Sequence, residues 1–92
     1  MLTEQRCDLI ISGKVQSVGF RYSVKLKAES LDLKGYVKNQ RDGSVFVAVQ
    51  GETVVVDDFV NWCYQGPPAA DVCGIEKITR GIEEFREFSV RY

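Results

Sequence analysis

The Asp42-Gly43 pair between two β-prone segments is the feature that most limits how this chain can fold. Tyr36-Val37-Lys38 precedes the pair, and an alternating run follows it: Val45, Val47 and Val49. Asp-Gly is typical of a β-hairpin turn, because such a turn needs positive φ angles that these residues tolerate. We therefore expect two neighbouring antiparallel strands in the middle of the chain, the second ending at Gly51.

A helix is expected before the hairpin, over Tyr22 to Leu33. Apolar residues there fit two periods, since Tyr22, Val24, Leu26 and Ala28 alternate while Val24, Ala28 and Leu31 share a helical face. Lysine, leucine, alanine and glutamate dominate the segment, which favours the helix. Gly35 follows as the expected stop.

A second helix is expected after the hairpin. Its apolar residues recur at helical spacing: Val55, Val56, Phe59, Val60, Trp62 and Cys63. Val55, Phe59 and Trp62 of this stripe are interpreted as core rather than as a cofactor site. Gly66 with Pro67 and Pro68 should end this helix, because proline cannot continue it.

Three further strands complete the pattern. Cys7 to Ser12 is rich in branched residues and ends at Gly13. Val72, Ile75 and Ile78 suggest a fourth strand with imperfect alternation, and Phe88, Val90 and Tyr92 a final one. The order predicts an α+β, ferredoxin-like two-layer sandwich (βαββαβ with a terminal strand), with two helices on one face of an antiparallel sheet. We expect residues 1–92 to form a single domain.

The charge balance and the missing histidine exclude several classes of function. Twelve Lys and Arg against thirteen Asp and Glu give a formal net charge of -1, so we expect neither nucleic acid nor a membrane as partner. The chain has no histidine, which excludes Ser-His-Asp and Cys-His catalysis and His-ligated zinc. The first residues lack the apolar stretch of a signal peptide, so a cytoplasmic location is expected.

Three cysteines, Cys7, Cys63 and Cys73, occur without any CxxC pair. We expect buried free thiols, with one disulfide as the alternative.

The segment from Ser12 to Arg21 carries the candidate chemistry. It joins the first strand to the first helix, and a glycine-bounded loop of this kind can form a nest of backbone N–H groups at the positive end of a helix. Arg21 could bind the same anion in bidentate fashion. Taken alone the signal is weak, because a loop with two glycines is more often only a turn.

Two motifs resemble signatures of the acylphosphatase family. Gly13-Lys14-Val15-Gln16-Ser17-Val18-Gly19-Phe20-Arg21 is similar to the family's Gly-Arg-Val-Gln-Gly-Val-Gly-Phe-Arg. Gly35-Tyr36-Val37-Lys38-Asn39, followed by Gly43, Val45 and Gly51, resembles the second signature. The resemblance runs from about Cys7 to Tyr92 in the family's order.

The resemblance implies hydrolysis of the carboxyl–phosphate bond in small acyl phosphates, by in-line attack of water without a metal, cofactor or phosphoenzyme. It implies that Arg21 and the loop amides bind the phosphoryl group and that Asn39 holds the attacking water. The implied phosphate-binding loop is Gly13, Lys14, Val15, Gln16, Ser17, Val18, Gly19 and Phe20. Inorganic phosphate or sulfate should compete with the substrate, and we expect a monomer.

Two alternatives belong to other classes. One is a non-catalytic domain of the same family that binds phosphate or carbamoyl phosphate without turning it over. The other is an RNA-recognition module, which shares the βαββαβ order; Lys34-Gly35-Tyr36-Val37 resembles its sheet motif only faintly, and the net charge opposes it.

The chain departs from the family pattern at Ser17, where the family has a glycine. If that position requires a positive φ, serine costs on the order of 1 kcal/mol there. Lys14 in place of the usual arginine is a milder change. If the condition at Ser17 holds, we expect weaker phosphate binding or a more mobile loop, with activity kept or reduced.

Overall fold

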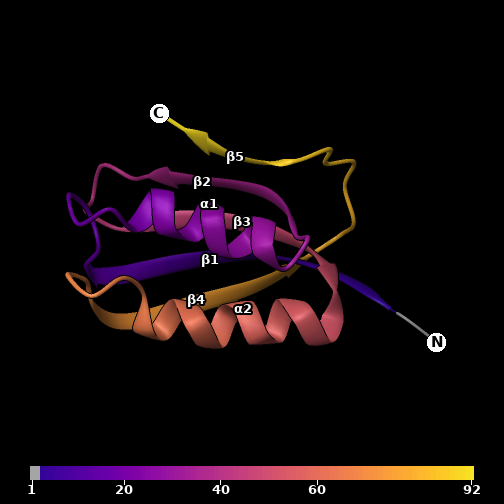
Figure 1. The fold of residues 1–92 in the computed structure, drawn as a ribbon, viewed down its shortest axis with the longest axis horizontal. Helices are drawn as coiled ribbons and strands as arrows, with labels where there is room; N and C mark the ends of the chain where they lie inside the picture. The colour runs from indigo at the N-terminus through magenta and orange to yellow at the C-terminus, as the bar shows by residue number, and fades with distance from the viewer. Residues whose placement is uncertain (1–2) are drawn as a thin grey trace.

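The computed structural model describes residues 3–92 and shows one mixed sheet covered by two helices (Figure 1). The elements in order are β1 (Glu4–Lys14), α1 (Phe20–Ser30), β2 (Lys34–Asn39), β3 (Val45–Glu52), α2 (Thr53–Gln65), β4 (Asp71–Arg80) and β5 (Phe88–Arg91). The strand order is β4-β1-β3-β2-β5. The predicted ferredoxin-like fold is confirmed, with one correction: the first four strands are antiparallel, but β5 pairs with β2 in parallel.

The core lies between the sheet and the two helices. β1 contributes Cys7, Leu9 and Ile11, all fully buried, because alternate residues of a strand face the same side. α1 packs mainly on β2 and β5, and α2 on β3 and β4. Their buried residues are Phe20, Val24 and Ala28 in α1, and Val56, Phe59 and Cys63 in α2. Within residues 3–92, neither helix is long and apolar enough to cross a bilayer.

The last residue of the first helix is Ser30, earlier than the predicted Leu33. The residue that stops the helix is Asp32, not the predicted Gly35. Asp32 adopts a left-handed φ of 57°. The Asp32 N–H donates to Glu29 O at 3.1 Å and the Leu33 N–H to Ala28 O at 2.9 Å, the two bonds of a Schellman motif. Aspartate tolerates this conformation better than most residues, which explains why the sequence pattern missed the stop.

Gly35 lies inside β2, where a close backbone approach requires it. Its φ is 137°, and a Cβ at this position would collide with the carbonyl oxygen of Ala48 on β3. The residue is buried and paired with Val49. The glycine that the sequence pattern assigned to a helix stop therefore serves sheet pairing.

A β-bulge explains the spacing of three residues between Val72 and Ile75 in β4. β1 does not end at Gly13 as predicted but continues to Lys14, with a register shift between Ser12 and Gly13. Ser12 pairs with Gly74 and Gly13 with Val72, so Cys73 between them has no partner among the described residues of β1. Because of this extra residue, Val72 and Ile75 both pack against the core despite their spacing of three.

The thiols are free, and the expected burial holds for two of the three. Cys7 and Cys63 are buried, whereas Cys73 at the bulge is exposed. Burial raises the pKa of both Cys7 and Cys63, which keeps these thiols protonated.

The hairpin forms where predicted, with a longer turn than Asp-Gly alone implies. Asn39 and Val45 are the last paired residues, and β3 continues one residue past Gly51. Gly43 has a positive φ of 95°, whereas Asp42 accepts hydrogen bonds from the Ser44 N–H at 2.9 Å and the Ser44 hydroxyl at 2.6 Å. These bonds lower the pKa of the Asp42 carboxyl, so the charged form holds the turn.

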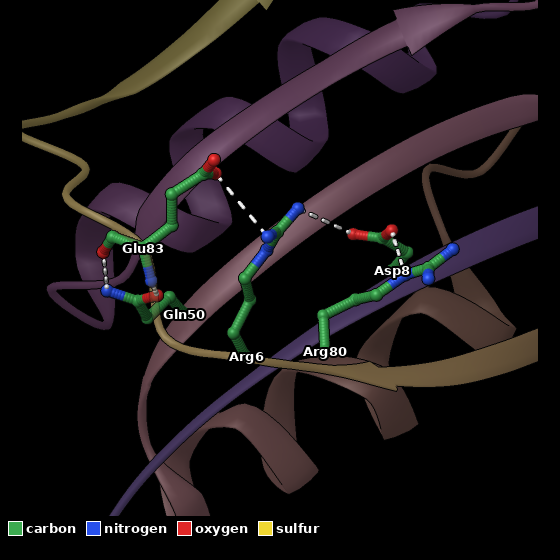
Figure 2. A network of polar contacts seen from close by, with 5 residues as sticks. All are labelled: Arg6, Asp8, Gln50, Arg80 and Glu83. Atoms are coloured by element: carbon green, nitrogen blue, oxygen red, sulfur yellow. Dashed lines mark hydrogen bonds and ion pairs between the residues drawn. The ribbon is translucent and has the colours of Figure 1, made fainter.

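The sheet face away from the helices carries a polar network (Figure 2). Asp8 is buried on this face and accepts from Arg80 Nε at 3.0 Å and Arg6 Nη2 at 3.3 Å. Gln50 Nε2 donates to Glu83 O at 2.7 Å, and Glu83 N donates back to Gln50 Oε1 at 2.8 Å. The network attaches the segment before β5 to the sheet.

Alanine at Gly35 should destabilise the protein far more than alanine at Gly43. Both positions have a positive φ, but only Gly35 lacks room for a Cβ. We expect Gly43→Ala to lower the free energy of unfolding by about 1 kcal/mol and Gly35→Ala by about 3 kcal/mol or more. Urea denaturation followed by Trp62 fluorescence measures both; equal losses would contradict the close approach.

Candidate active site

The strand directions bring three segments to one end of the sheet. β1 and β2 are both antiparallel to β3 and therefore run in the same direction, and β5 is parallel to β2. Their carboxyl ends lie at the same end of the molecule, where α1 begins (Figure 1). The loop after β1, the last residue of β2 and the end of β5 consequently meet.

A cavity of about 190 Å³ lies at this meeting point. Its lining residues come from the loop, the first turn of α1, and the ends of β2 and β5: Val15, Ser17, Gly19, Phe20, Arg21, Tyr22, Asn39, Val90 and Tyr92. The structure thus brings together Arg21 and Asn39, the two residues to which the sequence analysis gave catalytic roles, although they are 18 positions apart in the chain (39 minus 21).

The amino end of α1 opens onto this cavity. Gly19 is its N-cap with a left-handed φ of 76°, and Phe20, the first helical residue, is buried and anchors the helix to the core. The first N–H groups of a helix have no acceptor within the helix, and the helix dipole gives this end a partial positive charge. Arg21 adds a full positive charge in the first turn, so this end of α1 favours an anion.

Ser17 adopts the left-handed conformation that glycine normally supplies. Its φ is 61°, and the residue is exposed. Left-handed residues at Ser17 and Gly19 curl the loop tightly, and such curled backbone forms the amide arrays that bind anions. Position 17 therefore does require a positive φ, the condition under which serine is costly there.

Two aromatic residues of the cavity were not singled out from the sequence as site residues. The Arg21 guanidinium lies over the Tyr92 ring, with its Cζ 4.7 Å from the centroid. Tyr92 continues the alternating series Phe88, Val90, Tyr92, and Phe88 is buried in the core, so this alternation could have pointed to the site. Tyr22 follows Arg21 directly, and no separate sequence signal marks it.

Four residues of the predicted phosphate-binding loop lie outside the cavity lining. Gly13 and Lys14 belong to β1 and pair with Val72 and Asp71 of β4. Val18 packs against the core. The fourth is Gln16, whose side chain reaches the hairpin turn, as described below.

A second cavity, of about 410 Å³, has the wrong charge for an anion site. Among the described residues, its lining includes the carboxylates Glu4, Asp32 and Glu52 and one cation, Lys34. Phosphate would be repelled by the three carboxylates. The smaller cavity beside Arg21 is therefore the candidate active site.

The comparisons with known proteins identify a family for this chain. The family model described as Acylphosphatase matches residues 7–90. A curated acylphosphatase from Acaryochloris marina is 47% identical over 81 residues, which is 88% of this chain and 87% of that protein.

Two solved structures share the fold closely. The acylphosphatase from Bacillus subtilis is 35% identical with a TM-score of 0.93, and the match covers 96% of this chain and 99% of that chain. The acylphosphatase from Coxiella burnetii is 39% identical with a TM-score of 0.92, covering 96% and 93%. The chain therefore belongs to the acylphosphatase family.

Proposed function

We propose that this chain hydrolyses small acyl phosphates to a carboxylate and inorganic phosphate, with Arg21 and Asn39 as the catalytic residues. The observation that carries the proposal is the shared cavity, in which an arginine, the amino end of a helix and an asparagine meet. The family membership supports the substrate class.

The phosphoryl group binds at the amino end of α1. Its oxygens accept hydrogen bonds from the curled loop and from the first-turn amides, and the Arg21 guanidinium binds two of them. These donors also stabilise the negative charge on the equatorial oxygens in the transition state, which is the main requirement of phosphoryl transfer. Inorganic phosphate and sulfate present the same oxygens and compete for this site.

The substrate's leaving group explains why so few catalytic side chains are needed. Water forms a bond to phosphorus while the bond from phosphorus to the carboxylate oxygen breaks. One proton of the water stays on the attacking oxygen and the other passes to a second phosphate oxygen, so the products are a carboxylate and dihydrogen phosphate. The carboxylate that leaves has a conjugate acid with a pKa of about 4, by analogy with side-chain carboxyls. It therefore needs no general acid, and the chain has no histidine to supply one.

Asn39 acts on the water. Its side-chain carbonyl oxygen accepts a hydrogen bond from the water and holds it in line with the breaking bond. Asn39 is exposed and ends β2 at the cavity, so water reaches it from solvent.

The enzyme acts as a cytoplasmic monomer. A single chain brings together the loop, Arg21 and Asn39, so the proposed site is complete without a second copy. Three free thiols, one of them exposed, suit a reducing compartment.

Purified protein should hydrolyse benzoyl phosphate in the presence of EDTA, as followed by ultraviolet absorbance. It should leave a phenyl phosphate monoester essentially unchanged, because that leaving group is much more basic. Tight phosphate binding without turnover of benzoyl phosphate would instead establish the non-catalytic binding domain.

Arg21→Lys and Asn39→Ala should fail in different ways. Lysine loses the bidentate contact, so Arg21→Lys should weaken inhibition by phosphate and lower the rate together. Asn39→Ala should keep phosphate inhibition nearly intact while kcat falls by about 10²-fold or more, because only the positioning of water is lost. The assignment is wrong if Asn39→Ala loses phosphate binding and keeps its turnover.

Replacing Ser17 with glycine should tighten phosphate binding. Glycine adopts the observed φ of 61° without the cost of about 1 kcal/mol. A larger fraction of the unliganded protein then has the loop in its binding conformation, so the phosphate inhibition constant should fall by up to about fivefold. Ser17→Ala is the matched control, because it removes the hydroxyl and keeps the strain. Weaker phosphate inhibition in Ser17→Gly than in Ser17→Ala would refute this reading of the strained loop.

A further inference from the structure

The side chain of Gln16 links the phosphate-binding loop to the hairpin turn. Its Nε2 donates to Gln40 O at 2.7 Å and to Ser44 O at 2.8 Å, so both hydrogens of the amide are used. The side chain comes from the loop between β1 and α1, and the two acceptors belong to the turn between β2 and β3.

The two acceptors stand at the two ends of a rigid turn. Gln40 directly follows Asn39, and its own N–H donates to Ser44 O at 2.8 Å. Ser44 is buried, and its backbone N–H and hydroxyl both donate to Asp42. A turn closed by these internal bonds moves as one unit, so fixing its ends also fixes Asn39.

Within residues 3–92, no strand pairing joins the loop to Asn39 directly. β1 pairs with β3 and β4, while β2 pairs with β3 and β5. β3 therefore lies between β1, which leads into the loop and Arg21, and β2, which ends at Asn39. The Gln16 amide spans this separation at the end of the sheet where the cavity lies. It is therefore placed to set the distance between the bound phosphoryl group and the residue that holds the water.

We propose that Gln16 is a positioning residue that holds Asn39 in line with the phosphoryl group bound by Arg21. The proposal rests on the proposed function, because it takes the roles of Arg21 and Asn39 from there. It differs from the loop role first assigned to Gln16, since the side chain contacts the hairpin rather than the anion site.

Gln16→Met tests the proposal, because methionine has a similar length and cannot donate. Displacement of a positioned group by about 1 Å can cost up to about 10²-fold in rate, so kcat for benzoyl phosphate should fall by at least about 10-fold. The phosphate inhibition constant should stay within about threefold of the wild-type value, because Arg21 and the loop amides remain.

Gln50→Met is the matched control. Gln50 also uses its side-chain amide for two short bonds, to Glu83, but on the sheet face away from the helices (Figure 2). Its kcat should stay within about twofold of wild type while its urea midpoint falls, as expected for a purely structural bond pair.

A double-mutant cycle with Asn39→Ala identifies the residue through which Gln16 acts. If Gln16 works by positioning Asn39, Gln16→Met should lower kcat by less than about twofold in the Asn39→Ala background. Gln16→Asn, whose side chain is one methylene shorter, repeats the cycle if the methionine variant does not fold.

The outcomes separate this inference from the proposed function. Absence of wild-type turnover overturns both. If the wild type turns over, three results overturn the positioning role alone. They are an unchanged kcat in Gln16→Met, a phosphate inhibition constant that rises by the same factor by which kcat falls, and full additivity with Asn39→Ala.

Discussion

The pairing of β3 with both β1 and β2 is the constraint on which the site depends. Because β3 is antiparallel to each neighbour, β1 and β2 run in the same direction and finish at one end of the sheet. The loop that begins α1 and the residue that ends β2 are then neighbours in space although far apart in sequence. β5, parallel to β2, brings Val90 to the same cavity. Arg21 and Asn39 meet as a consequence of sheet topology.

The sequence was most informative where a local signal decided the structure. The Asp42-Gly43 hairpin and the second helix, ending at Gly66, depend on turn chemistry and helical periodicity, which short segments carry by themselves. The catalytic roles of Arg21 and Asn39 came from a resemblance to a family, and the structure places both residues in one cavity.

The errors arose where distant segments decide the structure. Gly35 is a glycine because of Ala48 on the adjacent strand, and the alternation of β4 is broken by a bulge against β1. The parallel pairing of β5 and the contacts of Gln16 are likewise set by residues far away in the chain. The error at Asp32 is local instead. Aspartate adopts there the left-handed conformation that glycine usually supplies at the end of a helix.

The proposed chemistry fits a site with one arginine and one amide, because an acyl phosphate supplies its own good leaving group. The most direct test of this account is a crystal structure of the protein with inorganic phosphate. The account predicts one phosphate in the cavity at the amino end of α1, with its oxygens about 3 Å from the Arg21 guanidinium and from loop amides, and with the Asn39 side chain facing it. Phosphate bound elsewhere, with this cavity empty, would contradict it.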